Sequence, residues 1–317
     1  MMQSSEGRTK VEFLVSIFVL VLVALAPLVV GNVYWLGVLI VCMYFAMQSV
    51  GWNLLAGYTG QMSLAPAAFA MVGAYGTGLM SYHLGAPPWI GIPVGVVTAF
   101  FIGVLLGWVV LRLSGAYLAL TTLAFAEILR LAIGNSYGFT RGDLGLNVPG
   151  IFESRLSYYY LMLGALTFVQ VGVYLLLRSK YGLYLQAIRD DEIAASSRGV
   201  DVVHWKTLAF AISAAICGLA GALYAHFAQL VSPELGLILQ TGFVLSMVVI
   251  GGIGTMSGPI IGAFLVYIVS EALRDAGGYH LIVFSLAVII IARFFREGLW
   301  GLIKLPFSRE KLKQAKA

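Results

Sequence analysis

The sequence contains few charged residues. Asp, Glu, Lys and Arg together make up 10% of the 317 residues, whereas 60% are apolar or aromatic. A soluble domain of ordinary composition has about 25% charged residues. Sixty per cent of this chain is about 190 residues, which at roughly 20 residues per bilayer-spanning helix allows nine or ten spans. The scarcity of charge therefore excludes a soluble enzyme, a secreted disulfide scaffold and a nucleic-acid-binding module, and it predicts an all-α polytopic membrane protein.

Cysteine and the usual signs of catalysis are also scarce. Cys42 and Cys217 each lie within an apolar run, which predicts small core side chains and neither a disulfide nor a metal site. The four histidines are far apart in the sequence and show no metal-binding spacing. No G-x-x-x-x-G-K-[ST] phosphate loop occurs, so the chain cannot hydrolyse ATP through such a loop. We therefore expect no enzymatic activity, no metal and no cofactor.

Apolar segments follow one another along the whole chain. Helices are the expected structure, because every backbone polar group in lipid must find its partner within its own segment. The first segment has a possible signal-peptide cleavage site but is predicted to be a retained span. The predicted spans are 13–30, 33–56, 64–82, 88–111, 113–134, 157–177, 207–231, two short crossings within 240–273, and 279–295. A single membrane domain over 1–317, with nine or ten spans, is the expectation.

Lysine and arginine are distributed unevenly between the two sides of this predicted bundle. Fifteen of the 19 fall near the N-terminus, at 112, in the loop 178–206 or after residue 292. Because cytoplasmic loops carry the excess of basic residues, an even number of crossings places both termini in the cytoplasm. The loop 135–157 would then be periplasmic. The basic tail 297–317 is expected to contact anionic membrane lipid rather than nucleic acid.

The loop 178–206 is the longest polar stretch. Residues 186–195 lack Gly and Pro and favour a helix, and Gly199 supplies a stop after it. One predicted face carries Tyr184, Ile188 and Ala195, with Ala187 and Ala194 nearby, and another carries Arg189, Asp190 and Glu192. A helix of such mixed character suits docking against a partner protein.

A seven-residue pattern, G-x-x-G-x-M-S, occurs at 57–63 and again at 251–257. Both copies interrupt long apolar runs, and a proline follows each, at Pro66 and Pro259. Paired Gly/Pro-interrupted segments in the two halves of a chain are typical of a transport pathway, and broken backbone is tolerated in a membrane only against protein or water. The alternative is two glycine-rich turns that allow close helix packing. The residues predicted to line a translocation pathway here are Asn53, Gly57, Gly60, Gln61, Ser63, Gly251, Gly254, Thr255 and Ser257.

Charged side chains within spans are rare. Glu127 and Arg130 are three residues apart on one helix face, where they can neutralise one another. The pair is assigned to the pathway as a gate or as a polar lining for a zwitterionic solute; a purely structural pair is the alternative. Glu12 and Glu271 lie near span ends and are expected to reach water.

Several of these segments, taken together, resemble a known family. Residues 51–64, 115–130, 182–199 and 251–259 are similar, in order, to the permeases of high-affinity branched-chain amino-acid ABC importers, specifically their LivM branch. The resemblance covers about 45–301. It implies a multi-pass permease of a bacterial inner membrane that moves a solute by alternating access while other subunits hydrolyse ATP.

The resemblance also implies partners. These are a second, LivH-like permease, two cytoplasmic LivG- and LivF-like ATPases and a periplasmic amino-acid-binding protein. Importers of this kind dock their ATPase through an E-A-A-x-x-x-G motif, which 192–199 matches with one inserted residue. The residues assigned to ATPase coupling are Ile188, Arg189, Asp190, Glu192, Ala194, Ala195 and Gly199.

Two other functions remain open. The family includes permeases for urea, short amides and other amino acids, so the solute is not fixed. A self-sufficient ion-coupled transporter would need several buried acidic residues, and the spans offer essentially Glu127.

Overall fold

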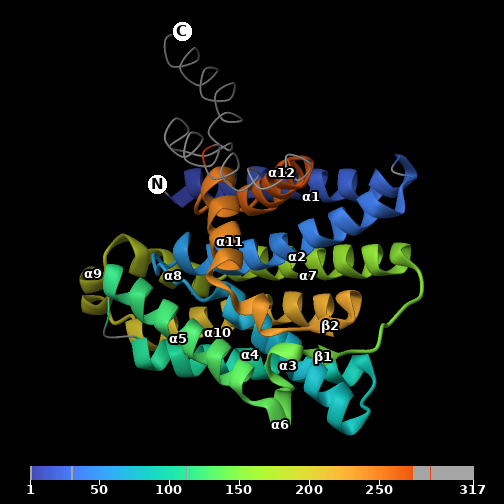
Figure 1. Cartoon of the computed structure of the whole chain (residues 1–317). Helices are drawn as coiled ribbons and strands as arrows, with labels where there is room; N and C mark the ends of the chain where they lie inside the picture. Colours follow the sequence, from blue (N-terminus) through green and yellow to red (C-terminus); the bar gives the residue numbers. More distant parts are fainter. Residues whose placement is uncertain (1, 30, 111–112, 114, 274–285, 287–317) are drawn as a thin grey trace.

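A computed structural model of the chain shows a bundle of α-helices (Figure 1). The structure describes residues 2–29, 31–110, 113, 115–273 and 286. The helices are α1 (Met2–Val29), α2 (Val33–Ala56), α3 (Pro66–Leu84), α4 (Pro88–Val110), α5 (Ala116–Asn135), α6 (Tyr137–Thr140), α7 (Arg155–Arg178), α8 (Lys180–Asp190), α9 (Glu192–Ser197), α10 (Val202–Ala228), α11 (Ile238–Gly251) and α12 (Gly258–Ala272). Short 3-10 turns η1 (Gly142–Leu144) and η2 (Pro233–Gly236) and strands β1 (Leu146–Asn147) and β2 (Leu230–Val231) complete the described elements.

The predicted all-α membrane architecture is confirmed. Nine of the ten predicted spans coincide with helices, and five of them (α2, α4, α5, α7 and α10) are long and apolar enough to cross a membrane. The apolar stretch 240–273 forms two short helices, α11 and α12, in place of one long helix, as predicted. The expected last span over 279–295 and the basic tail 297–317 lie outside the described residues.

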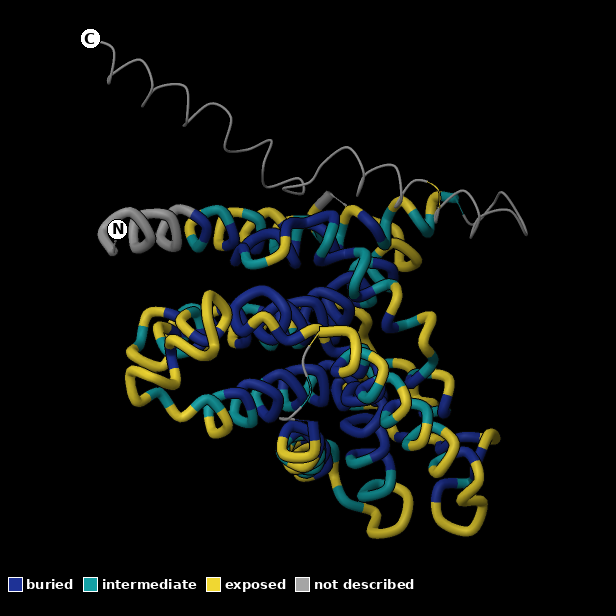
Figure 2. The backbone as a smooth tube through the Cα atoms, turned by 90° about the vertical axis from the view of Figure 1, so that its left-hand side faces the viewer, coloured by how far each residue is buried: buried dark blue, intermediate teal, exposed yellow. Residues whose placement is uncertain are grey.

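The core forms around α10, which packs against α4, α3 and α2. Small residues permit this close approach, as is common between membrane helices. A methyl group at Gly73 would overlap the backbone of Gly218, and one at Gly221 would overlap that of Ala70. Figure 2 shows the buried residues concentrated in these central helices, with exposed segments at the ends of the bundle. Cys42 and Cys217 are buried and free, as expected.

The two ends of the bundle carry different elements. Helices α8 and α9 lie together at one end, and the connection from β1 to α7 lies at the opposite end (Figure 1). Strands β1 and β2 pair antiparallel, with Leu146 opposite Val231, and so join the loop 135–157 to the segment after α10. The loop that contains the predicted docking helix is therefore far from the loop predicted to face the other side.

Candidate functional site

The first break separates α2 from α3. Gly57 ends α2, Gly60 has φ of +74°, and Pro66 occupies the first turn of α3, where a missing N–H costs nothing. Side chains of α2 and α5 bind two backbone groups of the turn. The indole Nε1 of Trp52 donates to the carbonyl of Ser63 at 2.6 Å, and the backbone N–H of Leu64 donates to Thr122 at 2.8 Å.

The second break separates α11 from α12 and has a similar turn. Gly254 occupies the position in the repeated pattern that Gly60 holds in the first copy, and its φ is +73°. This left-handed conformation favours glycine, because a side chain there meets the backbone. Thr255 Oγ1 donates to Gly252 O at 2.7 Å and accepts from Gly258 N at 3.2 Å. At this position, the sequence repeat thus corresponds to the same left-handed φ in both copies.

The two breaks meet through Asn53, near the end of α2. Its side-chain Nδ2 donates to the carbonyl of Thr255 at 2.9 Å, and its Oδ1 accepts from the N–H of Gly254 at 2.8 Å. The side-chain amide of Asn53 therefore both donates to and accepts from the backbone of the second break, as a peptide group would. Gly57 lies close beside them, since a Cβ atom at this position would come within 2.6 Å of Gly254 N.

Helices α1 and α7 supply the remaining partners of the second break. Glu12 Oε2 accepts from Met256 N at 3.1 Å, and Gln170 Nε2 donates to Met256 O at 2.8 Å. Glu12, expected to reach water, is instead buried, and it was not recognised as a contact of the break. The reason is that α1 packs along α7, which places this carboxylate against the break.

The polar side chains of both breaks are enclosed by protein in this conformation. Those of Asn53, Gln61, Ser63, Thr255 and Ser257 are all buried. Ser257 Oγ has no hydrogen-bond partner among the described residues. Gly251 packs so closely on Gly258 that a Cβ atom would overlap its backbone. The structure thus brings the second break against Asn53 and Gly57 and buries the polar side chains of both breaks.

The predicted docking helix is two helices. Asp191 interrupts it, because its carboxylate accepts from the backbone N–H groups of Ile193 and Ala194, both at 2.9 Å, and so caps α9. Gly199, with φ of +84°, follows the end of α9 as expected. Asp190 is exposed.

The faces of α8 and α9 differ in part from the expectation. Ile188 and Ala195 are buried against the bundle, because the apolar side of a short helix packs on its own protein. Glu192 pairs with the buried ammonium group of Lys206. Ala194 is exposed, and Ile193, which sequence reasoning did not assign, is 80% exposed.

Arg189 points toward the first break. Its Nη1 donates to the carbonyl of Gly57 at 2.6 Å, across 132 residues of sequence. The side chain is half-exposed, and Asp190 Oδ1 lies 3.8 Å from its Nε. This contact joins the loop between α7 and α10 directly to the breaks.

The Glu127–Arg130 pair lies elsewhere on the protein. Arg130 Nε donates to both oxygens of Glu127, at 3.2 and 3.0 Å. Along α5, Glu127 is about 7.5 Å and Arg130 about 12 Å from Thr122, which binds the first break. Arg130 also packs beside Gly236 of η2, a neighbour that the sequence did not predict. The structure therefore places this pair near the breaks but does not join it to them.

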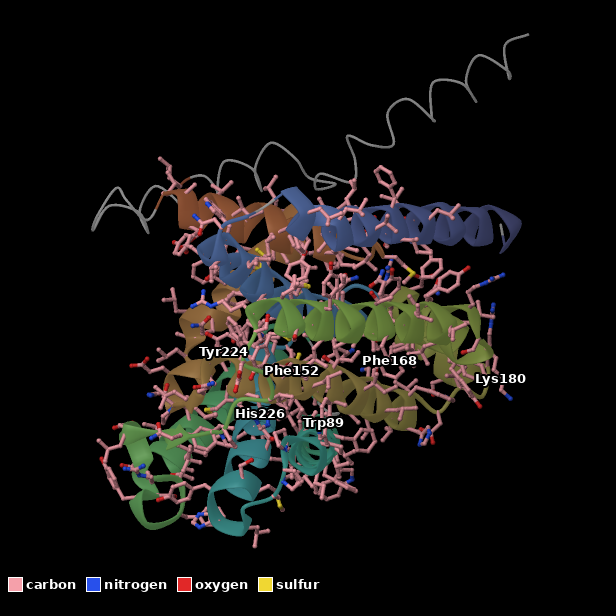
Figure 3. The ribbon with its side chains drawn as sticks, turned by 90° about the vertical axis from the view of Figure 1, so that its right-hand side faces the viewer. Trp89, Phe152, Phe168, Lys180, Tyr224 and His226 are labelled. Atoms are coloured by element: carbon pink, nitrogen blue, oxygen red, sulfur yellow. The ribbon has the colours of Figure 1, made fainter. Side chains whose placement is uncertain are left out.

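A buried histidine fixes the loop at the other end of the bundle. His226 Nδ1 lies 2.8 Å from Pro149 O, and its Nε2 lies 2.8 Å from Thr77 Oγ1. A carbonyl only accepts, so Nδ1 carries the hydrogen and a neutral ring accepts from Thr77 through Nε2. Figure 3 shows His226 far along the bundle from Lys180 at the start of α8. Sequence reasoning gave His226 no role.

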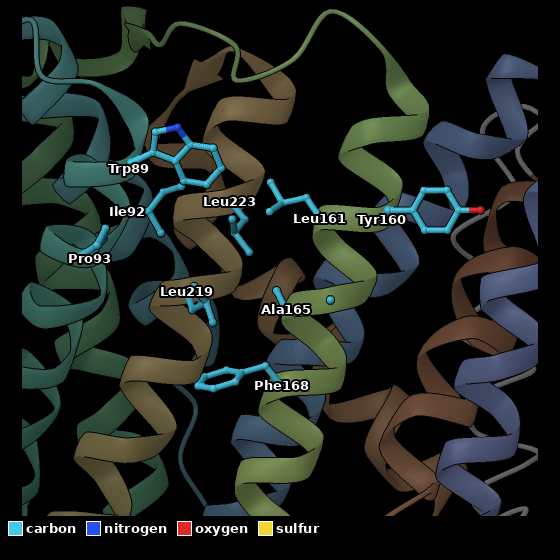
Figure 4. Close-up of a pocket in the computed structure, with 10 residues that line it drawn as sticks. Trp89, Ile92, Pro93, Tyr160, Leu161, Ala165, Phe168, Leu219 and Leu223 are labelled. Atoms are coloured by element: carbon cyan, nitrogen blue, oxygen red, sulfur yellow. The ribbon is translucent and has the colours of Figure 1, made fainter.

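A groove of about 470 Å³ opens between α4, α7 and α10 (Figure 4). Its lining is apolar and contains no charged residue: Trp89, Ile92, Pro93, Tyr160, Leu161, Gly164, Ala165, Phe168, Leu219 and Leu223. Such a lining suits hydrocarbon and does not suit a zwitterion. Within the described residues, no cluster of His, Cys, Asp and Glu could hold a metal ion.

A multi-pass helical protein whose two matching helix breaks meet inside the bundle has the architecture of a membrane transport permease. Residues 34–292 match the family model "Branched-chain amino acid transport system / permease component", and the chain belongs to this family. It is a permease subunit of an ABC importer and is not itself an enzyme.

Known proteins agree with this assignment. The chain is 31% identical to the high-affinity branched-chain amino acid transport system permease protein LivM of Escherichia coli K12, over 97% of this chain and 78% of that protein. It is also 31% identical to LivM of Salmonella typhimurium LT2, over 86% and 70%. The probable permease protein LivH of Methanocaldococcus jannaschii is 25% identical over 80% and 86%. No solved structure gives a significant match to the chain.

Proposed function

We propose that this permease carries branched-chain or related amino acids across a bacterial inner membrane. The observation that carries the proposal is the family match, with LivM relatives aligned over most of the chain. Urea, short amides and other amino acids are the alternative solutes, and separate ATPases supply the driving force.

The proposed assembly contains a second, LivH-like permease, two cytoplasmic LivG- and LivF-like ATPases and a periplasmic amino-acid-binding protein. Both LivM and LivH proteins are named as permeases of one transport system in Escherichia coli K12, and both are similar to this chain. This supports a pair of related permeases in the membrane.

We assign the end of the bundle with α8 and α9 to the cytoplasm. The distribution of Lys and Arg supports this, as does the separation of α8 and α9 from the loop 135–157. Both termini and the tail 297–317 would then be cytoplasmic, and the loop 135–157 would face the periplasmic binding protein.

The exposed side of α8 and α9 is the proposed ATPase contact. Ile193 is 80% exposed and Asp190 projects outward, so the two offer an apolar and an acidic group to a partner. The Glu192–Lys206 ion pair anchors α9 to the start of α10. An ATPase that moves α9 would thereby also move α10.

Helix α5 is the proposed contact with the second permease and one wall of the pathway. Only 17% of its apolar stretch is buried, against 67% for α10. It nevertheless carries Glu127 and Arg130, with side chains 44% and 23% exposed. Charged groups within a membrane face a protein interior or a water-filled cavity. A partner permease beside α5 would provide that cavity and allow the pair to contact a zwitterionic solute.

Affinity purification of this subunit from native membranes tests the proposal. Two ATPases and a second permease should co-purify, and the reconstituted complex should import a branched-chain amino acid only with ATP and a binding protein. Uptake by the isolated subunit under a proton or sodium gradient would instead establish ion coupling. Uptake of urea or an amide alone would change the solute.

A further inference from the structure

The two copies of the repeated pattern share a contact. Gly60 and Gly254 hold the same position in the two copies and have φ of +74° and +73°. Both glycines pack on Arg189, which comes from the loop between α7 and α10. A Cβ atom at Gly60 would lie 3.3 Å from Arg189 Cγ, and one at Gly254 would lie 3.2 Å from Arg189 Nη1.

The hydrogen bond of Arg189 lies within the same contact. Nη1 donates to Gly57 O, and a Cβ atom at Gly254 would lie 3.1 Å from that oxygen. Carbonyls at the end of an α-helix have no partner within the helix, so a cationic donor there is favourable. Three glycines from two breaks thus surround one side chain. We call this set of four residues (Arg189, Gly57, Gly60 and Gly254) the arginine clamp.

The clamp connects the loop to both breaks at once. Arg189 is in the last turn of α8, three residues before Glu192 at the start of α9. Its partner Gly57 caps α2, and Gly254 is bound to Asn53 of α2. A displacement of α8 therefore acts on the first break through a hydrogen bond and on the second through packing.

We propose that Arg189 is a positioning residue that transmits movement of α8 and α9 to both helix breaks, which separate only when the clamp releases. This rests on the proposed function, in which an ATPase moves α8 and α9. A residue that served only as a contact surface for the ATPase would need no bond to the bundle, whereas Arg189 is half-exposed and its Nη1 donates to Gly57 O.

Thiol labelling of Thr255→Cys in the purified full complex tests the inference without reference to the solute. Thr255 is 3% exposed and follows Gly254 directly, and the two native cysteines are buried. The rate of reaction with a small polar thiol reagent is measured without nucleotide and with a non-hydrolysable ATP analogue. With Arg189 present, the two rates should differ at least tenfold.

Arg189→Gln should reduce that difference to less than twofold. Arg189→Lys should give an intermediate value, because an ammonium group can bind Gly57 O but lacks the flat, multi-donor shape of a guanidinium. Arg198→Gln is the matched control: it removes the same charge from an exposed position in the same loop and should leave the difference intact.

A full nucleotide-dependent difference in Arg189→Gln would overturn the inference, and so would the absence of any difference when Arg189 is present. If Arg189→Gln does not assemble, Gly254→Ala decides, because its methyl would press on the clamp. Its control is Gly85→Ala, because Gly85 also has a positive φ (+61°) and a Cβ atom there meets nothing within 4 Å. A complex that shows the labelling pattern but imports no amino acid would contradict the proposed function alone.

Discussion

Asn53 provides the sharpest test of the junction between the two breaks. Replacing it with alanine removes the hydrogen bonds to Thr255 O (2.9 Å) and from Gly254 N (2.8 Å). An orphaned buried polar group costs about 1–3 kcal/mol, whereas hydrogen bonds between membrane helices contribute about 0.6–1.7 kcal/mol each. For the pair of bonds these become about 2–6 and about 1.2–3.4 kcal/mol, and the two ranges overlap at about 2–3.4 kcal/mol. We therefore expect Asn53→Ala to lose this much stability.

The assay is thermal unfolding of the purified subunit in detergent, followed by tryptophan fluorescence. At about 2 °C per kcal/mol for a chain of this size, Tm should fall by about 4–7 °C. Asn53→Leu restores volume without polarity, so it should be no more stable than Asn53→Ala. Asn135→Ala is the control, because this exposed side chain donates to Leu131 O at 2.9 Å and water can replace that bond. Equal losses for Asn53→Ala and Asn135→Ala, or recovery in Asn53→Leu, would refute the reasoning.

Two further predictions concern the loop 178–206 and the two helix breaks. Glu192→Lys places two ammonium groups together at Lys206 and should uncouple ATP hydrolysis from uptake. Exchanging both residues (Glu192→Lys with Lys206→Glu) restores opposite charges and should recover most of the coupled uptake. Wild-type uptake by Glu192→Lys would disprove a coupling role for Glu192. Cysteines at Gln61 and Thr255 should be unreactive in the conformation of this structure, where both positions are buried, and should react with a polar thiol reagent in another nucleotide state. The control is Met62→Cys, which is exposed and should react in all states. If both buried positions stay unlabelled throughout, the breaks are packing turns.

The course of the spans could be predicted because length and hydropathy determine it. The expected span 33–56 has the bounds of α2, and Pro66 and Pro88 begin α3 and α4, where proline favours a helix start. The continuous helix expected over 186–195 was wrong. Asp191 competes with helix propensity by capping α9, and no glycine or proline marks this break.

The site was predictable in composition but not in its contacts. The repeated pattern identified the two breaks, because both copies are local signals. The bond from Asn53 to the second break spans 202 positions of sequence, and the bond from Arg189 to the first break spans 132. No periodicity in a single sequence encodes such pairings. For the same reason the bond from Arg189 to Gly57 was not predicted, and Glu12 was expected to reach water. The direction of each side chain depends on which helix packs beside it.

The chemistry of the junction bears on how it could open. Asn53 joins α2 to the second break through two hydrogen bonds, and Arg189 binds the first break through a third. Water can replace all three when the groups separate. Each such bond contributes a net of about 1 kcal/mol, so releasing all three costs about 3 kcal/mol. Reversing a two-state population from 1:99 to 99:1 takes about 5.5 kcal/mol of differential binding. Three bonds of this strength would favour the closed junction, and the cost of releasing them is smaller than this differential binding. An apolar junction of equal area would resist wetting, so the polar character of these breaks supports the reversible opening that we propose.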